Sequence, residues 1–403
     1  MTTVEMPREQ FRLGMLLYDT RYRSLTIQAV ALIAFMAFAA WLVNNTVQNL
    51  DALGKDFNFG FLGARAGYDI SQTLIPYTND STHARAALVG IVNTLLVAFV
   101  GCMLATVIGV VMGVLRLSPN WIVARLAAVY VDGFRNIPVL LWILATMAII
   151  TDMAPAPAAF RGENATASML FGSIAVTNRG LYVPWPVFGP GWHLVVGTFI
   201  ASLVAIMLFG RWATKRQEET GQILPTFWIK LAIFFLPVLI VDRLVGSPIS
   251  LDYPVLQRFN FQGGGFLDKS FIALTLALSL YNGAFIAEAV RAGIQAVSRG
   301  QTEAAGALGI RPNRVMSLVV LPQALRVIIP PLISQYLNLT KNSSLAIAVG
   351  YADVRATLGG ITMNQTGREL ECMLLLMGFY LVLSLLISSV MNWYNARVAL
   401  KER

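Results

Sequence analysis

The sequence has 403 residues, of which 56% are hydrophobic and only 13% are charged. Soluble domains average about 45–50% apolar and about 25% charged residues, so this composition excludes an ordinary soluble enzyme or binding domain. The formal net charge is +9, but the basic residues lie between long apolar runs. Because that pattern is how membrane helices are oriented, we expect membrane lipid, and not nucleic acid, as the surrounding partner.

Metal, disulfide and hydrolytic chemistry find no support in the sequence. Cys102 and Cys372 lie in apolar runs and are interpreted as small hydrophobic residues. His83 and His193 are more than a hundred residues apart, and neither HExxH nor GxSxG occurs. We therefore expect no catalytic residue, no metal and no cofactor in this chain.

Eight apolar runs are candidates for membrane-spanning helices, because about 20 apolar residues are needed to cross a hydrocarbon core roughly 30 Å thick. They cover residues 25–43, 87–115, 137–152, 192–210, 227–245, 270–290, 327–349 and 372–392. The run at 137–152 is the weakest, since it is short and flanked by Pro138 and Asp152. The sequence predicts an all-α, polytopic membrane protein with about eight transmembrane helices.

The first run, the leader before it and the segment after the third run allow coarser predictions. Residues 25–43 resemble the core of a signal peptide, but the run is long and its leader mixes acids with bases, so we expect it to be retained. Residues 7–25 fit an interfacial helix and equally a disordered basic tail. Residues 153–191 are rich in Pro, Gly and aromatics, as in an outer loop, and contain the glycosylation sequon Asn164-Ala165-Thr166.

Lys and Arg are unevenly divided between the two sides of the predicted membrane. With the N-terminus placed inside, the five inner segments hold 18 of these residues and the four outer segments hold 10, although the inner segments are shorter in total. Lys230 and Lys341 fall within spans. The positive-inside rule therefore predicts that both termini are cytoplasmic.

Residues 298–323 lie between two apolar runs, on the predicted cytoplasmic side. Ser298 and Gln301 have the spacing of a capping box, which predicts a short helix from about residue 299. Gly309 fits the position that ends a helix, and Pro312 fits the first turn of a second one. Pro322 then interrupts or bends the chain as it returns to the membrane. The residues themselves fit a short helix that docks into a partner protein, and they fit an ordinary solvated loop equally well.

The same segment resembles the permease subunits of bacterial ABC importers, whose pattern is EAA-x3-G-x9-I-x-LP. The match consists of Glu303-Ala304-Ala305, Gly309 and Val319-Val320-Leu321-Pro322, with Val in place of Ile. Further stretches resemble the polar amino acid permeases of histidine and glutamine uptake systems. They read FRNIPVLLW (134–142), FIAEAVRAGIQAVSRGQTEAA (285–305), LPQALRVIIPPL (321–332) and LTKNSSLA (339–346).

This resemblance implies an architecture. Five spans match the helical core of a type I ABC importer permease, and three are additional, two of them inserted at 192–245. The longer layout is similar to the Q-type subunit of general L-amino-acid permeases and to its counterpart in glutamate/glutamine/aspartate/asparagine importers. We predict a leader, first span and periplasmic loop over 1–86, a transmembrane domain over 87–393, and a cytoplasmic tail over 394–403.

The resemblance also implies how transport is energised. The loop at 298–323 corresponds to the coupling helix that seats in the ATP-binding subunit, so its contact residues are expected to be Glu303, Ala304, Ala305, Gly309, Arg311 and Arg314. The two arginines fit that contact and equally fit an orienting role. No G-x4-G-K-[ST] motif occurs in the chain, so ATP is expected to be bound and hydrolysed by a partner. The alternative is a secondary transporter driven by an ion gradient.

Lys341 is the one charge predicted to lie deep in a span, about fifteen residues, or roughly 22 Å, beyond Arg326. Charges at such depth face a cavity or snorkel to the surface, and both readings stay open. An ammonium among amides and hydroxyls suits the carboxylate of an amino acid. The predicted substrate-path residues are Asn338, Lys341, Asn342, Ser343 and Ser344.

Two further pairs of charged residues and one asparagine are expected to be structural. Asp132 and Arg135 are spaced to pair along one helix face, with a gating role as the alternative. Glu288 and Arg291 have the same spacing and are expected to brace the coupling loop, with substrate binding as the alternative. Asn93 fits an interhelical hydrogen bond better than a place facing the pore.

Taken with the resemblance, these features predict a permease subunit that moves L-amino acids from the periplasm to the cytoplasm across a bacterial inner membrane. The family implies two copies of an ATP-binding subunit inside and a periplasmic amino-acid-binding protein outside. Because general amino-acid systems pair two different permeases, a heterodimer with a second permease is expected.

Overall fold

The computed structural model describes residues 20–52, 54, 56–162 and 165–398, which divide into two units at Gly63 and Ala64. The first unit contains α2 (Thr20–Ala52) and the short turn η1 (Gly60–Gly63). With 33 residues α2 is about 50 Å long, enough to cross a bilayer, and it contains the predicted span at 25–43. The remainder of the predicted interfacial helix (7–19), Asn164 of the sequon and residues 399–403 lie outside the described residues.

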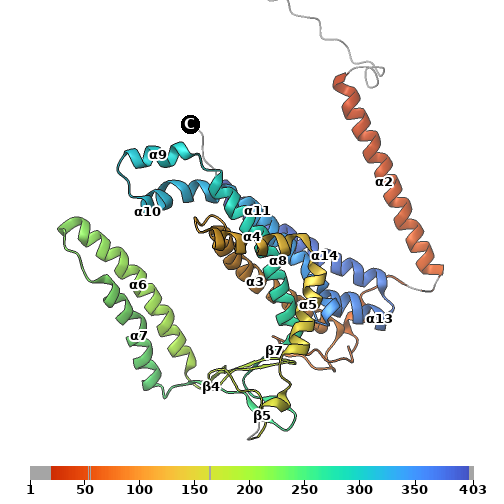
Figure 1. Cartoon of the computed structure of the whole chain (residues 1–403). Helices are drawn as coiled ribbons and strands as arrows, with labels where there is room; N and C mark the ends of the chain where they lie inside the picture. The colour runs from red at the N-terminus through yellow and green to blue at the C-terminus, as the bar shows by residue number, and fades with distance from the viewer. Residues whose placement is uncertain (1–19, 53, 55, 163–164, 399–403) are drawn as a thin grey trace, which may run out of the picture. The chain divides into compact units, whose positions relative to one another are not determined.

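The second unit is mainly helical (Figure 1). Its long helices are α3 (His83–Leu115), α4 (Trp121–Asn136), α5 (Val139–Met153), α6 (Trp192–Thr220), α7 (Thr226–Leu244), α8 (Lys269–Gln295), α9 (Arg299–Ala307), α11 (Leu321–Asn342) and α14 (Glu369–Val398). Shorter helical turns are η2 (Pro157–Phe160), α10 (Pro312–Val315), η3 (Met316–Val320), η4 (Ser343–Val349), α12 (Val354–Ala356), η5 (Thr357–Thr362) and α13 (Met363–Thr366).

All eight predicted spans lie on helices to within a few residues, except that 343–349 forms the 3₁₀ turn η4. Six helical segments of the described chain are long and apolar enough to cross a membrane, and the pair α4–α5 would be a seventh if it counts as one bent span. The helix α7 carries Lys230, Asp242 and Arg243 within 19 residues, which is why it falls short on composition. The membrane-protein fold is therefore confirmed, and the count of eight stays a prediction.

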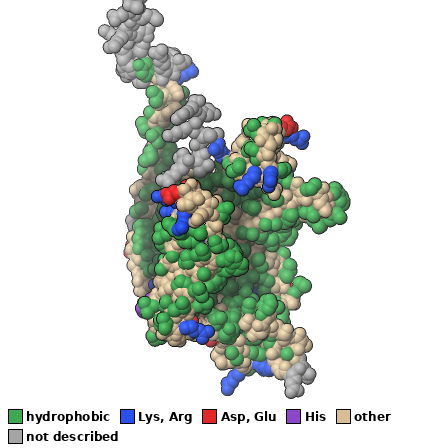
Figure 2. Space-filling model, turned by 90° about the vertical axis from the view of Figure 1, so that its left-hand side faces the viewer, with side chains coloured by type: hydrophobic (Ala, Val, Ile, Leu, Met, Phe, Trp, Pro, Cys, Tyr) green, Lys and Arg blue, Asp and Glu red, His purple; other side chains and the backbone are tan. Residues whose placement is uncertain are grey.

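Surface composition agrees with a membrane-embedded helical unit. Hydrophobic side chains cover the middle of the face drawn in Figure 2, and charged side chains gather towards its two ends. This distribution is expected where the middle contacts lipid tails and the ends contact headgroups and water.

The helix α8 is the centre of the second unit. In its apolar stretch 72% of the residues are buried, against 22% in α3, and it packs against α3, α4, α5 and α11. The residues of α3 that face its neighbours include Gly101, Ala105, Gly109 and Gly113, one small residue on every fourth position. Small residues let helix backbones approach closely, which is a main source of helix association where no hydrophobic driving force exists.

The closeness of this approach can be measured at two glycines. A Cβ atom on Gly109 would lie 2.5 Å from Cβ of Ile286, and one on Gly113 would lie 2.7 Å from the carbonyl oxygen of Ala287. Both partners belong to α8, and both are buried. No side chain fits at either position unless the two helices move apart.

A sharp bend separates α4 from α5. The two helices meet at 109° across Ile137 and Pro138. Proline lacks a backbone donor and disfavours helical dihedrals in the residue before it, and Ile137 accordingly has an extended conformation (φ −109°, ψ 135°). The predicted inner segment 116–136 thus contains a helix, α4, whose Ala127 and Val131 are buried.

Short strands, which the sequence analysis did not predict, connect the helices on the side of the N-terminus of α8. An antiparallel sheet has the order β1 (Ala175–Thr177), β2 (Gly180–Val183) and β7 (Gly265–Asp268). Two further antiparallel pairs join β3 (Trp185–Phe188) to β4 (Ile249–Asp252) and β5 (Val255–Gln257) to β6 (Asn260–Gln262). Strands of three or four residues are too short to show alternation, and β2 and β7 are separated in sequence by α6 and α7. The predicted outer loop therefore carries structure that only long-range pairing defines.

Substituting Gly109 tests the close packing of α3 on α8. We expect Gly109→Val to lower the stability by about 3 kcal/mol, because overpacking a tight contact forces backbone shifts. Gly378→Val is the matched control, since a Cβ atom at Gly378, also inside a long helix, meets no atom within 4 Å. Thermal unfolding of both purified variants measures the difference, and equal unfolding temperatures would contradict the tight contact.

Candidate functional site

The predicted coupling segment forms a helical hairpin beyond the ends of α8 and α11. Three residues separate the end of α8 at Gln295 from the start of α9 at Arg299, and α10 begins at Pro312. Figure 1 shows α9 and α10 side by side at one end of the unit. Ser298 occupies the N-cap position as predicted, but its side chain makes no capping hydrogen bond, so the predicted capping box is wrong while the helix start is confirmed.

The end of α9 is a Schellman motif. The amide of Gly309 donates to the carbonyl of Gly306 (2.9 Å), and the amide of Ile310 donates to the carbonyl of Ala305 (3.2 Å). Gly309 has a φ of +74°, the left-handed conformation that the sequence predicted and that favours glycine. The motif closes α9 and turns the chain into α10.

A small apolar cluster anchors this hairpin to the membrane helices. Ala305, Val315 and Val320 are buried together, with Ile294 and Val297 of the α8 region packed against them. Ala305 is therefore not on the surface that the sequence assigned to it. Its methyl group faces inward because residues at this position of α9 lie over α10 and η3.

The opposite surface of α9 is exposed. Glu303 and Ala304 lie on it, and Arg311 and Arg314, which follow the turn, are also exposed. At its tip Leu308 is 81% exposed, an unusual position for a large apolar side chain. The sequence analysis missed Leu308, although an isolated leucine beside the helix-ending Gly309 was a signal that could have identified it.

The return to the membrane is a widened helical turn. The amide of Leu321 donates to the carbonyl of Met316, five residues back, within the π-helical turn η3. Pro322 cannot donate, and its ring would clash with the carbonyl four residues earlier in a regular α-helix. The predicted interruption at Pro322 is thus absorbed as one wide turn, and α10, η3 and α11 follow one another without a loop.

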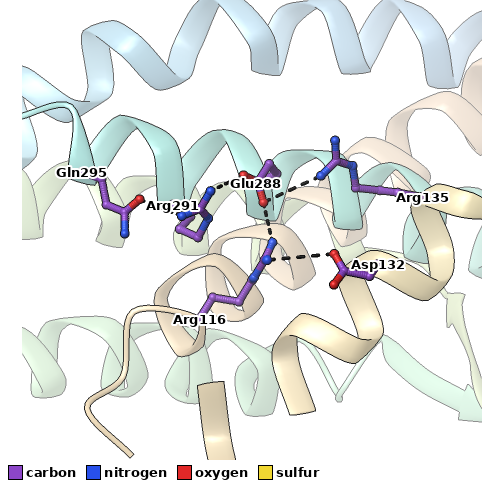
Figure 3. Close-up of polar contacts among 6 residues, drawn as sticks. All are labelled: Arg116, Asp132, Arg135, Glu288, Arg291 and Gln295. Carbon is purple, nitrogen blue, oxygen red and sulfur yellow. Dashed lines mark hydrogen bonds and ion pairs between the residues drawn. The ribbon is translucent and has the colours of Figure 1, made fainter. Parts of the chain in front are cut away.

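A cluster of charges joins three helices next to this hairpin (Figure 3). The carboxylate of Glu288 on α8 accepts from Arg291 at 2.5 Å through one oxygen and from Arg116, at the end of α3, through the other. Arg135 of α4 lies 3.8 Å from the same carboxylate and stacks on the ring of Phe285. The side chain of Arg291 also donates to Gln295 (2.7 Å).

The predicted pairs fare differently in this cluster. Glu288 and Arg291 pair as expected. Asp132 and Arg135 do not pair with each other, because Asp132 points to Arg116 (4.0 Å) while Arg135 points to Glu288. The cluster therefore ties α3, α4 and α8 together at the end of α8 from which α9 starts. Partial burial of Glu288 (25% exposed) reduces solvent screening of these contacts.

The predicted substrate-path residues separate into two groups. Asn338 and Lys341 are exposed and lie three residues apart on the same face of α11. Ser343 is buried, and its hydroxyl donates to the carbonyl of Thr340 (2.7 Å); Asn342 and Ser344 are half-buried. The core face of α11, which includes Ile333 and Leu339, is on the other side. Asn338 and Lys341 are thus the members free to meet a solute or another subunit.

Polar contacts hold the other end of α3. The amide of Asn93 donates to the carbonyls of Gln72 (3.0 Å) and Ala352 (2.9 Å), and the hydroxyl of Thr94 accepts from the amide of Val354 (3.0 Å). Asn93 is fully buried, so its role is to join α3 to two loops. Nearby, burial raises the pKa of Asp353, which caps α12, to about 6.

A cavity of about 450 Å³ lies between the loop at 69–71 and the helical turns at 347–364. The sequence analysis missed it. Asp69, Ser71 and Asn364 supply its polar lining, and Ile347 and Ile361 are among its apolar residues. Asp69 and Ser71 precede α3, whereas Ile347, Ile361 and Asn364 lie on η4, η5 and α13. Because these segments are far apart in the chain, no local pattern could have marked the cavity.

The comparisons with known proteins bear on the whole chain. A family model described as binding-protein-dependent transport system inner membrane component matches residues 193–400, more than half of the sequence. This chain belongs to that family. A member of the family is a membrane component of a transport system that works with a binding protein.

Three relatives match nearly the full length of this family member. The glutamate/glutamine/aspartate/asparagine transport system permease protein BztB of Rhodobacter capsulatus is 56% identical, with 98% of each chain covered. The general L-amino acid transport system permease protein AapQ of Rhizobium johnstonii is 47% identical, covering 96% of this chain and 95% of that one. The putative amino-acid ABC transporter permease protein YhdX of Escherichia coli is 43% identical, covering 94% and 95%.

Removing the central carboxylate tests the charge cluster of this permease. We expect Glu288→Gln to lower the stability by about 2 kcal/mol, because Arg116 and Arg291 would keep their charges without their shared acceptor. Asp80→Asn is the control: its pair with Arg65 is exposed (75% and 63%), so its loss should cost less than about 1 kcal/mol. Thermal unfolding measures the stability of both variants. Equal decreases in their unfolding temperatures would contradict a structural role for the charge cluster.

Proposed function

We propose that the chain is the transmembrane permease subunit of an ATP-driven importer that carries L-amino acids from the periplasm to the cytoplasm. The single observation that supports this most is the full-length similarity to permeases whose names specify amino acids. Those two similarities cover 98% and 96% of this chain, whereas the glutamine permease GlnM and the arginine permease ArtQ of Bacillus subtilis match only 35% and 36% of it.

The energy for transport comes from a separate ATP-binding subunit in this proposal. The chain contains no phosphate-binding G-x4-G-K-[ST] motif. The hairpin α9–α10 is the contact: its outer surface is exposed, its inner surface is anchored by Ala305, and its end is fixed by Gly309. A nucleotide can drive the pore only if its binding favours one conformation, and a rigidly anchored hairpin transmits that preference.

Leu308 and Glu303 are the proposed points of contact on α9. Leu308 is the exposed apolar anchor, Glu303 offers a carboxylate to a basic partner, and Arg311 and Arg314 offer guanidinium groups to acidic ones. Interface affinity is concentrated in a few well-packed residues, which makes a projecting leucine a strong candidate. Ala304 is small enough to let the partner's backbone approach.

Uptake of radiolabelled amino acids tests the function and the contact together. A strain lacking the chain should regain uptake with the wild-type protein, and that uptake should require the ATP-binding subunit. We expect Leu308→Asp to weaken association with that subunit by roughly thirtyfold, or about 2 kcal/mol, and to abolish uptake. Ile223→Asp is the matched control, because Ile223 is equally exposed (81%) but lies in the turn between α6 and α7.

Two outcomes of this experiment would contradict the proposal. Uptake that survives loss of the ATP-binding subunit and collapses with the ion gradient would support the alternative, a secondary transporter. Normal uptake by Leu308→Asp would show that α9 does not couple the permease to the ATP-binding subunit. It would not contradict the proposal that the substrate is an amino acid. Scanning substrates across side-chain classes then defines the breadth of transport.

The membrane arrangement follows from the same proposal. Both termini are cytoplasmic in a bacterial inner membrane, as the distribution of Lys and Arg favours. The transmembrane domain spans 87–393, with inserted helices at 192–245 and the coupling loop at 298–323. Residues 1–86 supply the leader, first span and periplasmic loop, and 394–403 the tail. A periplasmic binding protein delivers substrate, and a second, different permease completes a heterodimer with two ATP-binding subunits.

The exposed polar face of α11 is the proposed part of the substrate path. Asn338 and Lys341 lie on it, while Asn342, Ser343 and Ser344 support the turn that follows. An ammonium and an amide suit the α-carboxylate, which all amino acids share. The face is free in the single chain, as expected for a surface that borders either the pore or the second permease.

Substitution of Lys341 tests this path. We expect Lys341→Ala to reduce the apparent affinity for amino acids about tenfold, because a hydrogen bond to a charged group is lost. Lys341→Arg, which retains the charge, should keep most of the wild-type affinity. Assembly with the partner subunits, measured by co-purification, should be unchanged in both. An unaltered transport rate and affinity in Lys341→Ala would assign the side chain to the membrane surface instead.

A further inference from the structure

The inserted helices α6 and α7 enclose a groove with two chemically different ends. They pack against each other and are joined by residues 221–225. The groove has a volume of about 620 Å³ and runs along one face of α6, with Ile206 and Met207 at one end. The other end is polar and is lined by Gly210, Arg211, Thr214, Lys215 and Glu218, with Lys230 contributed by α7. From Ile206 to Glu218 the groove extends about 18 Å.

Gly210 makes room for the side chain of Lys230. A Cβ atom on Gly210 would lie 3.3 Å from the Nζ atom of Lys230 and 3.5 Å from its Cε atom. The ammonium group therefore crosses from α7 onto the surface of α6. It joins Arg211 there, so cations from both helices line the same groove.

The charge of the groove is not balanced by the protein. Its lining has three basic residues and one acidic residue, a formal excess of two positive charges. Lys215 is partly compensated by Glu219 at 3.7 Å. Over the described part of the chain, neither Arg211 nor Lys230 takes part in an ion pair. Charges near a membrane are costly when unpaired, so an anion is the expected complement.

Aromatic side chains place the polar end of the groove at a membrane surface. Trp212, Phe227 and Trp228 are exposed (49%, 66% and 68%) on the turns that flank the cations. Exposed Trp at the ends of apolar helices is typical of the headgroup region. The apolar end, with Ile206 and Met207, then points towards the lipid tails.

We propose that this groove is a binding site for an anionic phospholipid. The phosphate group contacts Arg211 and Lys230, and an acyl chain follows Ile206 and Met207 towards the bilayer centre. Guanidinium and ammonium groups on neighbouring helices suit a phosphate, and the change from polar to apolar lining suits an amphiphile and not a free ion. The site does not depend on the transported substrate; only its assignment to the cytoplasmic leaflet rests on the proposed orientation.

Lipid retention tests this site in the complete importer. The importer, purified with its partner subunits, is placed in nanodiscs of phosphatidylcholine with phosphatidylglycerol, re-extracted, and weighed by native mass spectrometry. We expect retained phosphatidylglycerol in the wild type. Because each cation near an anionic surface contributes about fivefold in affinity, Arg211→Gln with Lys230→Gln should weaken retention about twenty-five-fold.

Two further variants separate the groove from general charge effects. Arg216→Gln removes a cation from the same segment, but Arg216 stacks on Trp212 (5.2 Å) and does not line the groove, so retention should be unchanged. Gly210→Leu changes no charge, but it displaces Lys230 and fills the groove, so retention should fall. Only the end of a flexible side chain opposes this substitution, which leaves the helix pair intact.

Three results would overturn the proposal. If Arg216→Gln lost as much lipid as the Arg211→Gln/Lys230→Gln variant, the net charge of the segment and not the groove would explain lipid retention. Undiminished retention in Gly210→Leu would place the lipid elsewhere. A phosphate adduct on the wild type in pure phosphatidylcholine with added inorganic phosphate, together with no preference for phosphatidylglycerol, would assign the groove to a free anion.

Discussion

The close contact between α3 and α8 sets the geometry on which the other parts of the second unit depend. Gly109 and Gly113 bring the two backbones so near that no side chain fits between them. In a membrane, packing of this kind supplies association that hydrophobic burial supplies in water. Once α8 is fixed, α4, α5 and α11 pack around it, and the position of both its ends is defined.

The two ends of α8 carry different tasks. One end follows directly from β7 and connects to the strands, with Asp268 capping the helix. The other end carries Glu288 and leads after three residues into α9. The charge cluster there joins α3, α4 and α8 through one carboxylate, so a force applied at α9 reaches three helices together. This arrangement suits the coupling role that we propose for α9.

The added elements extend the permease without altering this centre. The helices α6 and α7 form their own pair, and the strands that flank them bring β2 and β7 together across the insertion. The insertion is thus closed by a short sheet, and α8 continues from β7 without interruption. A groove with a cationic and an apolar end gives the pair a use of its own, namely holding a lipid beside the transport core.

The sequence by itself determined the membrane class, the place of the helices, the start of the hairpin at α9 and α10, and the resemblance to a permease family. These features depend on local signals: apolar runs of a given length, Gly309 in a left-handed conformation and Pro312 in a first turn. Only the tertiary structure decided that Ala305 is buried while Leu308 is exposed, and that Asp132 pairs with Arg116 and not with Arg135. The same holds for Asn93, whose partners lie in loops far away in the chain. Spacing along a helix limits which residues share a face, but which neighbour covers that face is set by contacts between segments distant in sequence.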